Sequence, residues 1–418
     1  MSTQPDLGHA RLLRRPCRLL AVFAGAAIAL ALGSSPMRAS AQQPIKVGLT
    51  TDSTGVAAAF ARSQINGVQM AIDELNKSGG VLNRKVELIT RDSQLKPDLG
   101  TSHTRDLITG EKVDVLIGPA GSAVGITVSA MARQYRKVVM MTIPNSPRIT
   151  TEQFHSYVFS IVPSGLMEAR AMAEAVGPRF KRIAFIGGDY EAAHQNLKFF
   201  RDRLAKVHPE AQIVAQAWPK LGEQDYSSYI TRLMSAKPDL VYSYLWGADL
   251  VGFVKQAKPY GVFDKSTFAS LTYLDDIKAL GADLPEGVIG QMRAPFFALT
   301  SDKARKFTAD YRARFNDWPT DWAFMGYEGM QLLAAGIQAA GSTESDAIVK
   351  ALEQVRYEGL RGTISLRALD HLGNVPSFIG TTVADKETPF RQMKAVQRIP
   401  AEAIWPSADE VARLREAK

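Results

Sequence analysis

The chain has 418 residues, of which 46% are hydrophobic and 22% are charged, a composition typical of globular proteins and unlike disordered or fibrous ones. This length allows two or three domains with sizeable cores. The first 41 residues carry five Arg and one Asp, so the remainder has 45 basic and 41 acidic residues and a net charge near +4. No basic stripe with interleaved aromatic residues is present, so nucleic acid is not expected as a partner.

Residues 1–41 have the features of a secretory signal peptide. Four Arg lie between positions 11 and 18, an uncharged apolar stretch covers 19–32, and Ala39-Ser40-Ala41 forms a small-residue cleavage site. The apolar stretch is short for a membrane span, so an uncleaved anchor is the weaker alternative. We therefore expect a mature chain that starts near Gln42 and resides in the periplasm.

Cys17 is the only cysteine and lies within the expected signal peptide. A mature chain without thiols excludes cysteine nucleophiles, thiolate metal sites and disulfides. The six histidines are scattered without metal-ligand spacing, and the sequence contains none of the phosphate-loop, zinc-protease, nucleophile-elbow or calcium-loop motifs. We therefore expect no cofactor and no enzymatic activity.

From residue 44 onward, short apolar runs of β type alternate with segments of helical period, which predicts an α/β fold with parallel sheets covered by helices. In the first series we expect strands at 45–49, 86–89, 113–117 and 138–141, with helices spanning 65–75, opening at Pro97 and beginning at Ser122. A further strand at 157–161 precedes the second series. In the second series we expect strands at 183–186, 213–217, 240–244, 267–271 and 288–292, with helices at 164–176, 196–205, 226–235 and 250–260. Two series of similar size predict two Rossmann-like lobes.

The segment beyond Pro295 contains helical patterns at 302–315, 323–340 and 345–355 and short strands at 362–366 and 376–379. It forms either a third small domain or, as we favour, a return of the chain that completes both lobes. The expected first lobe is then 44–162 plus 294–370, the second is 163–293 plus 371–395, and 396–418 is a C-terminal tail. Several crossing segments form a hinge that opens and closes without unfolding either sheet.

The most informative local feature is the strand 113–117 followed by a glycine-containing turn that ends at Gly121 and Ser122. Glycines let the backbone approach a ligand, and Ser122 places a hydroxyl beside the unpaired N–H groups of a helix N-terminus. Such a corner at the carboxyl end of a parallel strand is suited to a carboxylate or phosphate. Capping of its own helix is an equally good role for Ser122.

Three further segments follow expected strands and could face the same crevice. In the first, prolines fix the loop around Asn145 and Ser146, which then offer polar groups, although turn formation explains them as well. In the second lobe, Trp246 follows one strand, and Thr272 and Tyr273 follow another. Aromatic residues there would wall an apolar ligand between the lobes, while core packing is the simpler alternative.

Several of these segments together resemble the leucine/isoleucine/valine-binding family of solute receptors of ABC transporters. The similar segments are Lys46-Val47-Gly48-Leu49, the helix from Asn66-Gly67 to Asn76 that closes on Gly79-Gly80-Val81, Val115-Leu116-Ile117-Gly118-Pro119 with Ser122, Arg182-Ile183-Ala184-Phe185-Ile186, Asp239-Leu240-Val241-Tyr242, Met325-Gly326-Tyr327-Glu328-Gly329 and Leu360-Arg361-Gly362-Thr363-Ile364. Their order and spacing cover nearly the whole mature chain.

The resemblance implies two Rossmann-like lobes joined by three crossovers, with the ligand in the cleft between them. It implies that Ser122 holds the ligand carboxylate, that Asn145 and Ser146 form the following binding loop, and that Phe60 covers the ligand. It also implies a periplasmic, monomeric protein that passes an amino acid or organic acid to the permease and ATPase subunits of an importer.

The chain departs from the family pattern at two points. Ala192-Ala193 stands where many relatives carry a tyrosine and a glycine, and no acidic residue is firmly placed to pair with an α-ammonium group, although Asp275 is one possibility. Aromatic acids, aliphatic acids and amides therefore remain open as ligands. Two other functions also remain open, a ligand-sensing module of a signalling system and an enzyme on a dinucleotide-type sheet.

Overall fold

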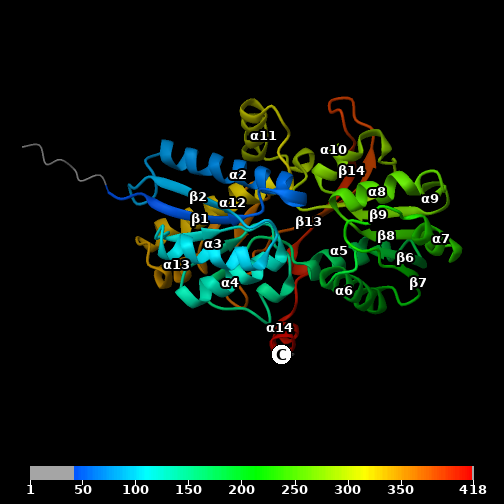
Figure 1. The fold of residues 1–418 in the computed structure, drawn as a ribbon, viewed down its shortest axis with the longest axis horizontal. Helices are drawn as coiled ribbons and strands as arrows, with labels where there is room; N and C mark the ends of the chain where they lie inside the picture. The colour runs from blue at the N-terminus through cyan, green and yellow to red at the C-terminus, as the bar shows by residue number, and fades with distance from the viewer. Residues whose placement is uncertain (1–41, 417–418) are drawn as a thin grey trace, which may run out of the picture. The chain divides into compact units, whose positions relative to one another are not determined.

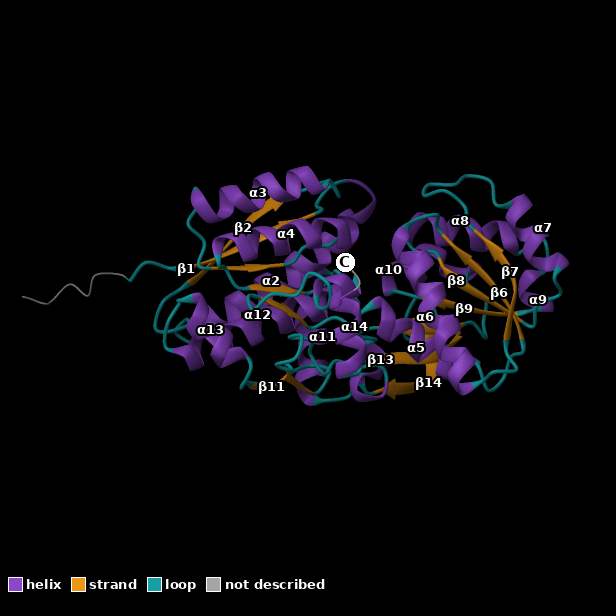
Figure 2. Ribbon diagram, turned by 90° about the horizontal axis from the view of Figure 1, so that it is seen from below, coloured by secondary structure: helices purple, strands orange, loops and turns teal. Residues whose placement is uncertain are grey.

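The computed structural model describes residues 42–416, and the chain from Gln43 onward forms one compact unit. The expected signal peptide, residues 1–41, lies outside the described residues. Within the compact unit, two open sheets are each accompanied by helices (Figures 1 and 2). In the part of the chain that is described, no helix combines the length and the apolar character needed to cross a membrane.

The first sheet has five strands in the order β2-β1-β3-β4-β5, and every neighbouring pair is parallel. Its central strands are buried along their length, which explains why they form continuous apolar runs in the sequence. The strands are β1 (Ile45–Thr51), β2 (Val86–Asp92), β3 (Val115–Ile117), β4 (Val139–Met141) and β5 (Val158–Ser160).

Two pairs of helices cover this sheet, α2 with α12 and α3 with α4. The contact between α2 and α12 depends on glycine, because a Cβ atom at Gly67 would lie 2.1 Å from the carbonyl oxygen of Ala323. A Cβ atom at Gly326 would lie 2.6 Å from the carbonyl oxygen of Gln64. The helices of this lobe are α2 (Ala58–Lys77), α3 (Pro97–Thr109), α4 (Ser122–Tyr135), α11 (Asp302–Phe315), α12 (Asp321–Ala340) and α13 (Ser345–Leu352).

The second sheet has seven strands in the order β14-β13-β10-β9-β8-β6-β7. The parallel arrangement is confirmed for five of them, whereas β13 and β14 join antiparallel at one edge. The expected tail beginning at residue 396 needs correction, because that position lies inside β14. The strands are β6 (Arg182–Gly187), β7 (Gln212–Ala217), β8 (Leu240–Tyr244), β9 (Thr267–Leu271), β10 (Ile289–Met292), β13 (Ser377–Val383) and β14 (Gln392–Ile399).

The helices of the second lobe also form two groups, α5 with α6 and α8 with α7 and α10. Helix α5 has a side-chain cap, because the hydroxyl of Ser164 accepts a hydrogen bond from the backbone N–H of Met167. The helices are α5 (Gly165–Val176), α6 (Glu191–Val207), α7 (Ser227–Ser235), α8 (Gly247–Ala257), α9 (Val262–Lys265) and α10 (Leu274–Leu280).

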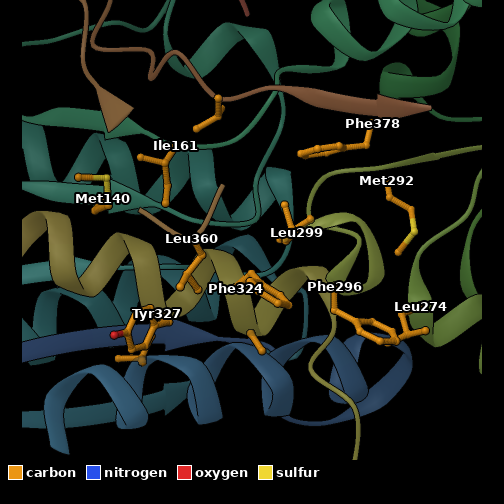
Figure 3. Packing of buried hydrophobic residues seen from close by; sticks show 14 of the residues in the cluster. Met140, Ile161, Leu274, Met292, Phe296, Leu299, Phe324, Tyr327, Leu360 and Phe378 are labelled. Carbon is orange, nitrogen blue, oxygen red and sulfur yellow. The ribbon is translucent and has the colours of Figure 1, made fainter. Parts of the chain in front are cut away.

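The chain passes between the two sheets after β5, after β10 and before β13. A small antiparallel sheet of β11 (Arg356–Glu358) and β12 (Thr363–Ser365) precedes the third passage. Buried apolar residues form one cluster that includes members of both lobes, among them Phe324 of α12, Leu299 after β10 and Phe378 of β13 (Figure 3). The hydrophobic core is therefore continuous between the two lobes at the three passages.

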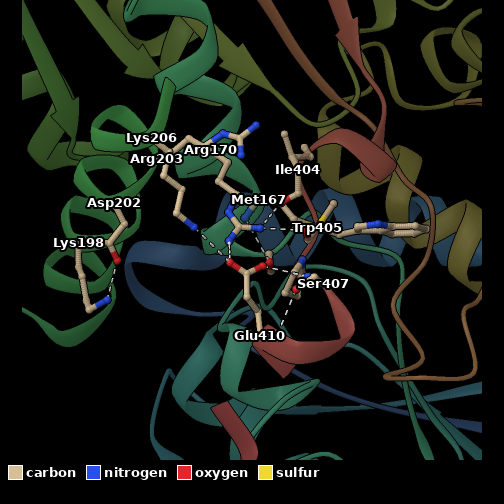
Figure 4. Close-up of polar contacts among 12 residues, drawn as sticks. Met167, Arg170, Lys198, Asp202, Arg203, Lys206, Ile404, Trp405, Ser407 and Glu410 are labelled. Carbon is tan, nitrogen blue, oxygen red and sulfur yellow. Dashed lines mark hydrogen bonds and ion pairs between the residues drawn. The ribbon is translucent and has the colours of Figure 1, made fainter. Parts of the chain in front are cut away.

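The segment after β14 ends in α14 (Ala408–Glu416) and contacts both lobes. Arg170 of α5 donates to the carbonyl oxygens of Ile404 and Trp405, at 3.3 and 2.9 Å, and to the carboxylate of Glu410 at 2.8 Å (Figure 4). Arg415 donates to the carbonyl oxygen of Leu369, which precedes β13, at 2.8 Å. The C-terminal segment is therefore packed against the body.

Candidate functional site at the junction of the lobes

Ser122 and Asn145 lie together at the carboxyl ends of β3 and β4. The Ser122 hydroxyl donates to Oδ1 of Asn145 at 3.4 Å, and the backbone N–H of Asn145 donates to Oγ of Ser122 at 3.3 Å. Both bonds are long, so each is weak. Because Ser122 is the first residue of α4, its own N–H and that of Ala123 have no carbonyl partner within the helix. The two polar segments expected from the sequence therefore meet.

Gly121 has a different role from the one expected. Its backbone N–H donates to Oδ2 of Asp52 at 2.9 Å, and this buried carboxylate also accepts from Ser93 and from the N–H of Leu95. A Cβ atom at Gly121 would lie 2.5 Å from Cδ2 of Leu95. The sequence predicted that the backbone at Gly121 approaches a ligand; instead its amide holds an internal carboxylate, and the glycine permits close packing against Leu95.

Asn145 connects the two lobes. Its Nδ2 donates to Oε2 of Glu168 in α5 at 2.8 Å and, at 3.4 Å, to the hydroxyl of Tyr244 in β8. Its carbonyl oxygen accepts from the N–H of Gly165 at 2.8 Å. The neighbouring Ser146 is half-buried, and its carbonyl oxygen accepts from the N–H of Ile149 within a 3-10 turn.

Four aromatic side chains form a cluster between the lobes, which we call the aromatic cluster: Phe60 and Trp322 of the first lobe, and Trp246 and Tyr273 of the second. The ring centroid of Phe60 lies 4.8 Å from that of Trp322, 6.2 Å from Trp246 and 6.4 Å from Tyr273. The rings of Tyr273 and Trp322 are 4.6 Å apart. Thr272 lies apart from the cluster, because it is fully buried and its hydroxyl donates to the carbonyl oxygen of Ser270.

A buried ion pair links the Ser122–Asn145 pair to the aromatic cluster. Nε of Arg293 lies 2.7 Å from Oε1 of Glu168, and their side chains are only 4% and 1% exposed. Arg293 also donates to the carbonyl oxygen of Ile143 at 3.0 Å, and its guanidinium lies 5.3 and 5.2 Å from the ring centroids of Tyr273 and Trp322. Burial is the largest single effect and lowers the pKa of Arg293, but the charge and hydrogen bond of Glu168 together with Tyr273 and Tyr244 outweigh it, so the pKa is raised and the guanidinium stays charged.

Asp275 and Asp321 are the carboxylates that border the aromatic cluster. Asp275 is half-buried and accepts from Nε1 of Trp322 at 3.0 Å; burial, followed by the charge of Asp321, raises its pKa to about 6. Asp321 is fully buried and accepts from the backbone N–H groups of Arg293 and Ala294, each at 2.8 Å. Burial also raises the pKa of Asp321.

Sequence reasoning missed Trp322, Glu168 and Arg293. Arg293 follows the expected strand 288–292 directly, and Glu168 lies in the first turn of α5 directly after the apolar residues Leu166 and Met167. A single charge in an apolar setting is a signal for a buried ion pair, although it does not identify the partner. Within residues 42–416, no group of three or more His, Cys, Asp or Glu side chains is arranged to hold a metal ion.

Two parallel-stranded α/β lobes with polar and aromatic groups at their junction define the class of two-lobed periplasmic receptors. The family described as "Periplasmic binding protein" matches residues 44–387, and the chain belongs to this family. Membership implies a solute-binding protein outside the cytoplasm, and it confirms the resemblance to the leucine/isoleucine/valine-binding proteins.

Individual relatives are similar over most of their length. A Leu/Ile/Val-binding protein of Rhizobium johnstonii is 27% identical over 75% of this chain and 84% of its own. A leucine-, isoleucine-, valine-, threonine- and alanine-binding protein of Pseudomonas aeruginosa is 23% identical over 86% of this chain and 94% of its own. Both relatives are named for the amino acids they bind.

Solved structures share the fold at lower identity. A branched-chain amino acid transporter substrate-binding protein of Streptococcus pneumoniae, in complex with isoleucine, has a TM-score of 0.76 at 21% identity and covers 86% of this chain and 100% of its own. A solute-binding protein of Rhodopseudomonas palustris, in complex with 3,4-dihydroxybenzoic acid, has a TM-score of 0.77 at 21% identity and covers 85% of this chain and 98% of its own. At these identities the likeness supports the two-lobed fold alone.

Proposed function

We propose that the protein captures a small carboxylate-bearing ligand between its lobes and delivers it to the permease and ATPase subunits of an ABC importer. The ligand class includes amino acids, aromatic or aliphatic acids, and their amides. Residues 1–41 direct the chain to the periplasm and are removed there. The mature protein acts as a monomer, without a cofactor and without catalysis.

The observation that carries this proposal is that polar groups at one helix N-terminus are connected, through Asn145 and the Glu168–Arg293 pair, to an aromatic cluster supplied by both lobes. The hydroxyl of Ser122 and the first-turn N–H groups of α4 suit a carboxylate, because donors and the helix dipole both favour negative charge there. Asn145 and Ser146 complete this polar end. Phe60 and Trp246 provide the apolar end, where exclusion of water strengthens the polar contacts.

The names of the relatives support the same ligand chemistry. The curated relatives bind leucine, isoleucine and valine by name, and two solved neighbours hold isoleucine and 3,4-dihydroxybenzoic acid. These compounds share a carboxylate joined to an apolar or aromatic body. A site with one anion-binding end and one aromatic end is suited to this shared feature.

We propose the lobe boundaries as expected from the sequence, with one amendment. The first lobe is 44–162 plus 294–370, and the second is 163–293 plus the segment from 371 to the end of β14 at Ile399. Closure then rotates the two sheets about the three passages, and the contacts of Asn145 with α5 form only when the lobes approach.

Isothermal titration calorimetry of the mature chain, beginning at Gln42, tests the binding function. The panel contains the common amino acids, benzoate and hydroxybenzoates, and short aliphatic acids and amides. We expect micromolar or tighter binding by at least one compound, accompanied by a rise in the melting temperature. Absence of both heat and thermal stabilisation across the whole panel would contradict the proposal.

A further inference from the structure

We infer that the Glu168–Arg293 ion pair makes the proposed site selective for acids that lack an α-ammonium group. This inference rests on the proposed function and narrows its ligand class. In an α-amino acid, the ammonium group is attached to the carbon next to the carboxylate. Its counter-charge must therefore lie beside the groups that hold the carboxylate.

Glu168 is the carboxylate that hydrogen bonds connect to that position. Its Oε2 accepts from Nδ2 of Asn145 at 2.8 Å, and Asn145 in turn exchanges hydrogen bonds with Ser122. A charged carboxylate without a partner here would be well placed to bind an α-ammonium group. What decides the specificity is whether Glu168 is available.

The structure shows that both oxygens of Glu168 are engaged. Oε1 accepts from Nε of Arg293 at 2.7 Å, Oε2 accepts from Asn145, and the Glu168 side chain is 1% exposed. The negative charge of Glu168 is therefore balanced within the protein. An ammonium group beside it would lose its water shell without gaining a free counter-ion, which is unfavourable.

Arg293 adds a second obstacle to a cationic ligand. Its guanidinium lies over the rings of Tyr273 and Trp322, at 5.3 and 5.2 Å from their centroids. Ring faces attract cations, and these two already have one. An ammonium group could reach these ring faces only by displacing the guanidinium.

Two other nearby carboxylates are buried and use Oδ1 alone to hold backbone N–H groups, and the Oδ2 atom of each has no hydrogen-bond partner among the described residues. Asp321 is fully buried and holds the backbone N–H groups of Arg293 and Ala294. Asp276 is 2% exposed, and its Oδ1 holds the N–H of Gly247. Asp275 is half-buried and accepts from the indole N–H of Trp322, and it is the one we include as an alternative ammonium partner in the test.

The test compares compounds that differ only in the α-ammonium group. Calorimetry at pH 7 is performed on the mature wild-type chain with 3-phenylpropanoate against phenylalanine, 4-methylpentanoate against leucine, and phenylacetate against phenylglycine. We expect the acid of at least one pair to bind at least tenfold more tightly than its amino acid, with no pair reversed. Amino acids that bind as tightly as the acids, or more tightly, would overturn the inference while the proposed function stood. Binding by none of the six would overturn the inference and, together with a silent wider panel, the proposed function as well.

Variants separate the ion pair from the alternative partner. Arg293→Gln removes the internal counter-charge of Glu168, so we expect the acid-to-amino-acid preference to fall at least tenfold. The double variant Glu168→Gln/Arg293→Gln has no free carboxylate there and should not gain affinity for the amino acid. Asp275→Asn is the matched control and should leave the preference unchanged; a change of tenfold in Asp275→Asn alone would assign the role to Asp275 and refute the inference. If a variant fails to fold, the comparison of acids with amino acids on the wild-type protein still tests the inference.

Discussion

Replacing Glu328 by Gln should destabilise the protein strongly, because this side chain fixes the turn between β11 and β12, which precedes the third passage, to α12. Glu328 and Arg361 are both 0% exposed, and Nε of Arg361 lies 2.6 Å from Oε2 of Glu328. Oε1 accepts from the backbone N–H groups of Leu360 and Arg361 at 2.6 and 2.8 Å. Arg361 also donates to the carbonyl oxygen of Ile161, which lies on the first passage, at 3.0 Å.

The magnitude follows from what the amide changes. Gln keeps one oxygen for the two backbone N–H groups, but its NH₂ group then faces Nε–H of Arg361, and the buried guanidinium loses its counter-charge. Removing one partner of a buried pair typically costs about 3–5 kcal/mol. This is a large part of the roughly 5–15 kcal/mol by which folded domains are stable.

Urea unfolding followed by far-ultraviolet circular dichroism measures this loss as a lower midpoint with an unchanged slope. The control is Glu344→Gln, an exposed position at the start of α13, which should stay within about 0.5 kcal/mol of the wild type. Adding Arg361→Met to Glu328→Gln removes the unpaired charge and should restore part of the stability. A loss below about 1 kcal/mol for Glu328→Gln alone would refute the reasoning.

Three further predictions concern binding and pH. Ser122→Ala removes the hydroxyl that we propose donates to the ligand carboxylate. Such a bond to a charged group contributes about 1.5–3 kcal/mol, so affinity measured by calorimetry should fall about 10- to 150-fold, whereas Ser235→Ala at an exposed position should bind normally. Burial, followed by the charge of Asp275, raises the pKa of Asp276 from 3.8 to about 8, so the folded state favours the protonated carboxyl and the free energy of unfolding falls as pH rises between these values. Asp276→Asn lacks this group, so in urea unfolding its stability relative to wild type should increase from pH 5 to pH 8. Burial lowers the pKa of His155 from 6.5 to about 4, so the free energy of unfolding should fall as pH drops from 6.5 to 4. If the free energy of unfolding of the wild type fell no more steeply over this range than that of His155→Gln, the prediction would be wrong.

The order of strands and helices could be predicted from the sequence because buried parallel strands and amphipathic helices each have a characteristic pattern of apolar residues. The helix expected from residue 65 is part of α2, and the helical pattern at 323–340 is part of α12. β14 was missed for a physical reason. It pairs on one side only, and its apolar residues are interrupted by polar ones, among them the exposed Lys394 and Arg398, so it lacks the apolar run that identifies a buried strand.

Only part of the polar end of the candidate site could be predicted from the sequence. A serine at a helix N-terminus after a glycine turn is visible in the sequence, and the structure brings Ser122 to Asn145 as that pattern suggests. The partner of Gly121 was not visible, because Asp52 comes from the end of a strand 69 residues earlier. Long-range pairs such as this one and Glu168–Arg293 are properties of the folded arrangement, and no local pattern encodes them.

The long hydrogen bonds between Ser122 and Asn145 give a reason why ligand binding and lobe closure would depend on each other. At 3.3 and 3.4 Å these bonds are weak, so a carboxylate can take over the Ser122 hydroxyl at little cost. The bond from Asn145 to Glu168, at 2.8 Å, joins the lobes and need not be broken when this happens. The exposed ion pair of Arg148 with Glu191, at 3.3 Å, also spans the lobes but contributes little. The bonds of Arg293 to the carbonyl oxygen of Ile143 and of Trp322 to Asp275, each at 3.0 Å, also join the lobes. A ligand that touches both Ser122 and the aromatic cluster would add its contacts with both lobes to these and so stabilise the closed state further.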